Sequence, residues 1–163
     1  MAGEAAEALQ GGLTEAEKRR NVVRLAFGGS DERFEAFLRV VREEIPPGTS
    51  VILRGSAVTG IRWRDRAPFD ADGPGTSDLD LTLVGDAVIG LYKATAFFVP
   101  GLHSRPVCDE EPELAPSLIP LRETLMVMTG RPVNIQASRA IVIDFRGGLL
   151  DQPYLTLVDK AAS

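Results

Sequence analysis

Cysteine and histidine are nearly absent from this 163-residue chain, which contains one of each, Cys108 and His103. One cysteine cannot form an internal disulfide, and such sparing use is typical of a reducing compartment, so we expect a cytoplasmic location. One histidine and one cysteine also supply too few ligands for the usual Cys/His zinc sites. Disulfide scaffolds and such zinc proteins are therefore excluded, and we expect His103, in a loop rich in proline and glycine, to be incidental.

Long apolar runs, signal sequences and P-loops are missing too. No uninterrupted apolar stretch approaches the ~20 residues of a membrane-spanning helix, and the acidic N-terminus lacks the basic and apolar regions of a secretory signal. Gly55 and Gly60 have P-loop spacing, but Ile61 and Arg62 follow them in place of Lys and Ser/Thr. The net charge of −5 argues against long nucleic acid, whose binding depends on neutralising phosphates. We expect no membrane partner and no long nucleic-acid partner.

The composition is that of a globular domain, with 44% hydrophobic and 25% charged residues. The first residues are rich in Ala and Gly and predict a flexible tail over 1–12, while residues 13–163 suffice for a single domain with a substantial core. Helical and extended signals alternate along that domain. We therefore expect an α/β (α+β) fold, with a small mixed β-sheet and helices mainly on one face.

Local signals place the elements of that fold. The capping box of Thr14 and Glu17 predicts the start of a helix that ends near Gly28, and a second helix follows Ser30 and stops before Pro46. The further expectations are strands over 51–53, 77–84 and 132–136, a helix-compatible stretch over 86–98, a surface loop over 100–116, a helix over 116–129 and a packed segment over 153–158. Residues 139–150 fit either a short helix or a strand.

Two aspartates, Asp78 and Asp80, are the most informative residues that are present. They stand two positions apart at the start of a predicted strand, so their side chains point to the same face. Carboxylates held side by side repel each other unless a cation lies between them, and Mg²⁺ (or Mn²⁺) binds carboxylates together with substrate phosphates. Gly55 and Ser56, which close the preceding strand, supply close backbone approach and a hydroxyl for gripping phosphates. The combination favours metal-dependent nucleotidyl transfer.

The aspartate pair also fits other classes of protein in part. Asp-x-Asp-x-Thr is also typical of haloacid-dehalogenase-type phosphatases, but there the pair follows an apolar run at the carboxyl end of its strand. Here residues 73–77 form a Gly/Pro-rich loop before the pair, and the apolar residues come after it, which disfavours that class. Glycosyltransferases with Asp-x-Asp need a longer nucleotide-binding half upstream than the largely helical N-terminal part of this chain can supply, which disfavours that class too. Two solvated aspartates at a strand end, with no ligand, remain an alternative.

The order of helix, strand, Gly-Ser, loop, Asp-x-Asp strand, helix and strand resembles the DNA-polymerase-β-like nucleotidyltransferase superfamily, in its minimal stand-alone type. The resemblance rests on the sequences Leu-Arg-Gly-Ser at 53–56 and Ser-Asp-Leu-Asp-Leu at 77–81, and it spans residues 31–138. It implies that Asp78 and Asp80 hold Mg²⁺ and that Gly55 and Ser56 bind a triphosphate. The implied reaction transfers a nucleoside monophosphate from an NTP to a hydroxyl acceptor, a small molecule or a protein, and releases pyrophosphate.

The chain departs from the family pattern at the third carboxylate. Where the family often places that group on the next core strand, this chain offers Asn134. Asp144 is the nearby acidic candidate, provided that residues 141–145 form a strand beside the aspartate pair. An amide can offer its carbonyl oxygen to a metal but cannot take a proton near neutral pH. The alternative function is therefore a catalytically weak or inactive module that binds nucleotide, a partner protein or a second copy of itself.

The loop over 61–77 is longer than the compact family members usually have, and it carries further candidates. Asp70 and Asp72 would add to the metal site if the loop folded back onto it. Trp63 is expected to anchor the loop by packing. The arginines of this region can reach phosphates, although a charged loop is more often only solvated; they are Arg54, Arg62, Arg64 and Arg66.

Overall fold

The computed structural model describes residues 12–148, 150 and 152–160, so the tail predicted over 1–12 lies, apart from Gly12, outside the described residues. The fold is α+β, with a mixed open sheet of six strands in the order β3-β4-β5-β2-β1-β6. The helices are α2 Glu15–Ala26, α3 Asp31–Glu44, α4 Ser56–Thr59, α5 Asp86–Ile89, α6 Ile119–Thr129 and α7 Ala140–Gly148. The strands are β1 Ser50–Arg54, β2 Leu79–Val84, β3 Phe97–Val99, β4 His103–Ser104, β5 Val133–Ser138 and β6 Tyr154–Val158.

The two N-terminal helices begin where the sequence predicts. The Thr14 hydroxyl accepts the Glu17 N–H at 3.1 Å, and the Glu17 carboxylate accepts the Thr14 N–H at 2.8 Å, which completes the capping box of α2. The Ser30 hydroxyl caps α3 by accepting the Arg33 N–H. The Asn21 side chain of α2 donates to the Val58 carbonyl at 2.8 Å, so α2 supports the short helix α4 that follows β1.

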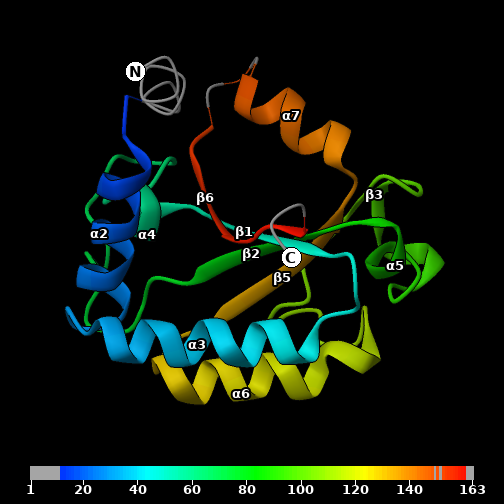
Figure 1. The fold of residues 1–163 in the computed structure, drawn as a ribbon, viewed down its shortest axis with the longest axis horizontal. Helices are drawn as coiled ribbons and strands as arrows, with labels where there is room; N and C mark the ends of the chain where they lie inside the picture. Colours follow the sequence, from blue (N-terminus) through cyan, green and yellow to red (C-terminus); the bar gives the residue numbers. More distant parts are fainter. Residues whose placement is uncertain (1–11, 149, 151, 161–163) are drawn as a thin grey trace.

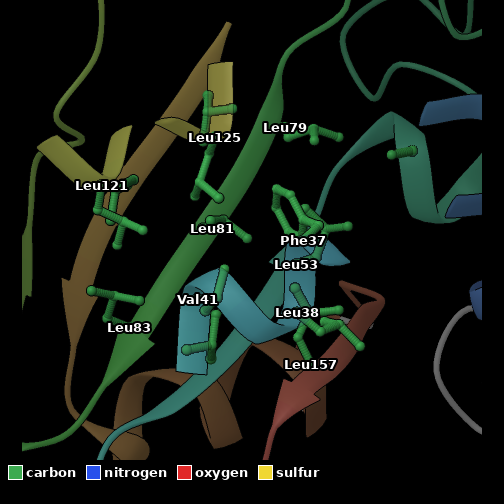
Figure 2. Close-up of a cluster of buried hydrophobic side chains, with 14 of the residues drawn as sticks. Phe37, Leu38, Val41, Leu53, Leu79, Leu81, Leu83, Leu121, Leu125 and Leu157 are labelled. Carbon is green, nitrogen blue, oxygen red and sulfur yellow. The ribbon is translucent and has the colours of Figure 1, made fainter. Parts of the chain in front are cut away.

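One face of the sheet forms the main hydrophobic core. Helices α3 and α6 lie side by side against this face, and Figure 2 shows the leucines of β2 between side chains of the two helices. Because strand side chains alternate, Leu79, Leu81 and Leu83 all point into this core and are at most 1% exposed. Full burial of each contributes roughly 1.5–3 kcal/mol, so β2 is strongly held in register.

The opposite face of the sheet is largely polar. Asp80 and Thr82 of β2, Arg54 of β1, and Asn134 and Gln136 of β5 alternate with the core residues and therefore share it. Helix α7 lies over this side of the sheet, opposite α3 and α6 (Figure 1). It is fixed there by a small apolar cluster, in which Ile143 of α7 packs with Ile52 and Val84. A polar layer is thus enclosed between the sheet and α7.

The middle of the chain differs most from the sequence-based expectations. The stretch 86–98, expected to be helix-compatible throughout, contains only short helical turns before β3. The expected surface loop over 100–116 contributes β4, in which His103 is 4% exposed, so this part of the stretch is buried in the sheet rather than at the surface. The undecided stretch 139–150 forms helix α7, and the packed C-terminal segment forms β6, an edge strand beside β1. Tertiary pairing overrides local propensity at these strands.

The loop before β2 is fastened by one ion pair. Arg131, just ahead of β5, donates to both carboxylate oxygens of Asp70, at 2.8 and 3.1 Å, and to the Ser77 carbonyl at 2.8 Å. The same carboxylate accepts the N–H groups of Ser77 and Gly75, at 2.9 and 3.2 Å. Burial raises the pKa of Asp70, but the Arg131 hydrogen bonds and the two N–H groups outweigh it and lower the pKa to about 2. Ser77, the residue next to Asp78, is therefore held in place by these hydrogen bonds.

Replacing Asp70 with Asn tests this fastening. A carboxyl whose pKa is depressed from 3.8 to about 2 contributes stability above pH ~4 that is lost as the pH falls through 2. We expect Asp70→Asn to lower the free energy of unfolding by about 2 kcal/mol at pH 7, with the difference closing toward pH 2. Urea unfolding at pH 7, 4 and 2.5 measures this. Asp72→Asn, in a more exposed pair with Arg62, is the control and should change stability by no more than ~1 kcal/mol; equal effects of the two changes would contradict the account.

Candidate functional site

Strand register brings the predicted site residues together on the polar face of the sheet. Arg54 at the end of β1 pairs with Asp80 of the antiparallel β2, and Asp80 pairs with Asn134 of the parallel β5. Asp78 stands two residues before Asp80, and Gly55 follows Arg54 directly. Three neighbouring strands therefore contribute to a single cluster. The spacing of the two aspartates predicts only that these two side chains share a face.

The Asn134 side chain lies between the two carboxylates. Its amide nitrogen donates to Oδ2 of Asp78 at 2.7 Å and to Oδ1 of Asp80 at 2.9 Å. Both partners are acceptors, so the amide must present its NH₂ group rather than its oxygen to them. The two carboxylates thus converge on one point, which the partly positive NH₂ group occupies.

Asp80 has the most perturbed acidity in this cluster. Burial raises its pKa, and the neighbouring negative charge of Asp78 raises it further, while the Asn134 amide and the Arg54 charge act in the opposite direction. The resulting pKa of Asp80 is about 6. Ionising both aspartates is therefore costly in the absence of a cation, which is the electrostatic condition expected of a metal-binding pair.

Gly55 allows the turn after β1 to approach Asp80 closely. Its φ of 93° lies in the region that favours glycine, and a Cβ at this position would stand 3.0 Å from Oδ2 of Asp80. Any substitution at Gly55 therefore strains the backbone as well as the site. The Ser56 hydroxyl, at the start of α4, has no hydrogen-bond partner among the residues that the structure describes, so it can donate to a ligand.

The other acidic candidates do not join the cluster. Asp144 lies on helix α7 and is exposed, so the strand it needed over 141–145 is absent from this described segment. Asp70 is bound to Arg131, and Asp72 pairs with Arg62 at the surface. Trp63 is 74% exposed, which corrects the expectation that it anchors its loop by packing.

The donor set fits a hard divalent cation. Asp78 and Asp80 present carboxylate oxygens to a common point, and a rotation of the Asn134 amide would add a neutral oxygen; such oxygen ligands suit Mg²⁺ and Mn²⁺. Over the described ranges, no group of three or more His, Cys, Asp or Glu residues comes together in a way that could hold a metal. A metal here would therefore bind two carboxylates and depend on a ligand such as phosphate for its remaining coordination.

A cleft of about 650 Å³ opens beside this cluster. Asp80, Gly55 and three arginines, Arg54, Arg66 and Arg146, contribute to its lining. Exposed apolar side chains of the loop after α4 and of the segment before β6 line it as well. A second groove, of about 610 Å³, lies at the opposite end of β1 between the end of α3 and β6, away from the aspartates. The first cleft is the one that can hold a ligand against Asp80.

Two residues of this polar layer were missed at the sequence level. Gln136 stands two positions after Asn134, so the period of two along a strand already places both on one face. Arg146 gives no such signal, because it belongs to the stretch whose secondary structure the sequence left undecided. Its position over the sheet follows only from the packing of α7.

Comparisons with known proteins add no assignment, because the chain matches no protein-family model, no curated protein and no solved structure.

Asp80→Asn should stabilise the metal-free protein. Because the folded-state pKa of Asp80 is raised from 3.8 to about 6, the folded state loses stability as the pH rises through this window and the group ionises. Thermal unfolding in EDTA should therefore show a higher midpoint for Asp80→Asn than for the wild type at pH 8, by an amount equivalent to roughly 2 kcal/mol. The difference should vanish below pH ~4. Asp144→Asn, on exposed α7, is the matched control; a wild type as stable as Asp80→Asn at pH 8 would show that the pair is not strained.

Proposed function

We propose that this protein is a Mg²⁺- or Mn²⁺-dependent nucleotidyltransferase with the fold of the DNA-polymerase-β-like superfamily. The observation that carries the proposal is the convergence of Asp78 and Asp80 beside the Gly55–Ser56 turn. The strand order supports it, since the Gly-Ser strand β1 is antiparallel to the Asp-x-Asp strand β2, which is parallel to β5. In the reaction, an acceptor hydroxyl attacks the α-phosphorus of an NTP, the bond to the bridging oxygen breaks, and pyrophosphate leaves.

Each residue of the site has a distinct task in this proposal. Asp78 and Asp80 hold the cation, which when bound neutralises charge on the phosphates. Gly55 lets the phosphates approach the backbone, and the Ser56 hydroxyl donates a hydrogen bond to them. The cleft beside Asp80 then has room for the acceptor.

Asn134 is the residue that limits catalysis. It occupies the strand position beside Asp80, but its amide cannot accept the proton that the acceptor hydroxyl loses. The proposed enzyme is therefore slow unless another group of the acceptor molecule, or the solvent, takes that proton. The same observation supports the second candidate function, a module of this fold that binds nucleotide, a partner protein or a second copy without turnover.

In this proposal the acceptor is a small molecule or a protein that carries a hydroxyl group. A net charge of −5 disfavours long nucleic acid, as the composition already indicates. Within the described residues, no helix combines the length and the apolar character needed to cross a membrane. We propose that the protein acts on cytoplasmic substrates.

Metal-dependent NTP binding is the first test. Calorimetry with ATP, GTP, CTP and UTP should detect binding of at least one nucleotide only when Mg²⁺ or Mn²⁺ is present. Asp80→Asn should abolish it while the fold remains intact, and Ser56→Ala should weaken it by about 1.5–3 kcal/mol, the contribution of a hydrogen bond to a charged group. Asp144→Asn is the control and should bind normally. Binding that does not need metal, or that survives Asp80→Asn, contradicts the proposal.

Asn134→Asp separates a weakened enzyme from a binding module. With glycerol supplied as a hydroxyl acceptor and Mn²⁺ as the metal, pyrophosphate release should rise at least about tenfold over the wild type, because a carboxylate can take a proton where the amide cannot. Asn134→Ala removes the amide without adding a base and should give no gain. If Asn134→Asp folds and binds NTP but gains nothing, the assignment of Asn134 to the third-carboxylate position is wrong.

A further inference from the structure

Three arginines line the cleft without an ion pair among the described residues: Arg66 is exposed on its loop, whereas Arg54 and Arg146 are partly buried. Arg54 ends β1 and Arg146 belongs to α7, and both line the cleft that also reaches Asp80. Elsewhere the chain pairs its inward arginines with acids, as Arg122 does with Asp109 and Arg131 with Asp70. Neither Arg54 nor Arg146 makes such an ion pair within the described part of the chain. Their unbalanced charge is therefore a local feature of the cleft.

Arg54 is fixed in place by neutral groups. Its guanidinium donates to Oε1 of Gln136 at 3.0 Å, and the Gln136 amide donates in turn to the Ser104 carbonyl at 3.1 Å. The Nε–H of Arg54 is buried and has no partner among the described residues. An unsatisfied buried donor is costly, so the hydrogen bonds of Arg54 are incomplete in this position.

The region around the two arginines is electropositive. Burial lowers the pKa of Arg54, and the charge of Arg146 lowers it further. Burial also lowers the pKa of the nearby His103, to about 4, with the charges of Arg146 and Arg54 adding to the effect. Asp80 is the carboxylate that offsets the charge of Arg54, and the proposed function commits that carboxylate to the metal. The charges of the two arginines are then left without a counter-ion, which an anionic ligand can supply.

The position of Arg54 separates this anion from the NTP phosphates. The side chain starts on β1 and crosses β2 to reach Gln136 on β5, whereas the Gly55–Ser56 turn stays at the end of β1. Gln136 pairs with Thr82, so the guanidinium is directed along the sheet toward Thr82, whereas the turn assigned to the triphosphate continues from Arg54 in the opposite direction. Guanidinium groups bind phosphate through paired hydrogen bonds, and two of them suit a dianion.

We propose that Arg54 and Arg146 bind a phosphate group of the acceptor, so that the acceptor is a small phosphorylated compound with a free hydroxyl. This inference rests on the proposed function. Exposed apolar side chains of the same cleft, Ile61, Trp63 and Leu150, are available to cover the organic part of such a compound. The negative net charge of the chain is no obstacle, because the positive charge is concentrated locally.

Glycerol 2-phosphate is a suitable probe, since it carries one phosphate and free hydroxyls. Calorimetry on the full chain should show that it binds both alone and with a saturating non-hydrolysable NTP analogue and Mg²⁺ present. Arg146→Gln should weaken its binding at least tenfold and leave the analogue's affinity within about twofold. Arg54→Lys, which keeps the charge but loses the fork of donors, should weaken it as well. Arg39→Gln, an exposed change on α3, is the charge-matched control and should have no effect.

Three outcomes overturn the inference in distinguishable ways. If the analogue displaces glycerol 2-phosphate and Arg146→Gln weakens the analogue instead, the arginines belong to the NTP site. If the wild type binds Mg²⁺-NTP but no glycerol 2-phosphate at millimolar concentration, the acceptor subsite is wrong and the proposed function stands. If the wild type binds no NTP at all, the proposed function fails and this inference fails with it.

Discussion

The hydrogen bonds from one amide to two carboxylates are the interaction on which the polar face of the sheet depends. Asp78 and Asp80 are held side by side by a strand whose alternate residues are locked in the core, so they cannot move apart to relieve their repulsion. The Asn134 NH₂ group offsets part of that repulsion at distances of 2.7 and 2.9 Å. It does so only in part, because the pKa of Asp80 still rises to about 6. The fold thus retains a carboxylate pair that costs stability, which is typical of a functional site rather than of a structural one.

The positive charges of the cleft complement this negative pair. Gly55 lies close to Asp80, and Arg54 is directed away from the turn toward Gln136, so a cation held by the aspartates would have both proposed anion-binding groups nearby. A nucleotide and a second phosphorylated compound would then meet across the metal. In the proposed function, that arrangement would bring an acceptor hydroxyl toward an α-phosphorus, and such positioning is the main contribution a protein can make to phosphoryl chemistry.

Local signals predicted the parts of the structure that local chemistry determines. The capping box at Thr14, the helix ending at Gly130 and the alternation around Asp80 each depend on residues a few positions apart, and the structure confirms these elements. The expectation that Asn134 lies beside the pair came from the family resemblance, and the register of β5 with β2 does place it there. Contacts distant in sequence were not predictable in the same way: β4 is two residues long and depends on its pairing with β3 and β5.

In the candidate site, too, Arg54 and Arg146 could not be singled out from local sequence signals. Arg54 was one of several arginines near the Gly-Ser turn, and nothing in its neighbours distinguished it from those of the solvated loop. Its role follows from the strand register that aims it at Gln136 and from the packing of α7, which brings Arg146 over the sheet. The carboxylates proposed to hold a metal could be predicted from the sequence, whereas the arginines proposed to select a substrate required the tertiary structure.

The position of a bound metal tests the central claim most directly. Crystals grown with Mn²⁺ and a non-hydrolysable NTP should give an anomalous difference peak between the carboxylates of Asp78 and Asp80. The Asn134 amide should be displaced from its present position, and the triphosphate should lie against the Gly55–Ser56 turn. A peak elsewhere, or a nucleotide bound in the groove between α3 and β6 with no metal at the aspartate pair, would contradict the account.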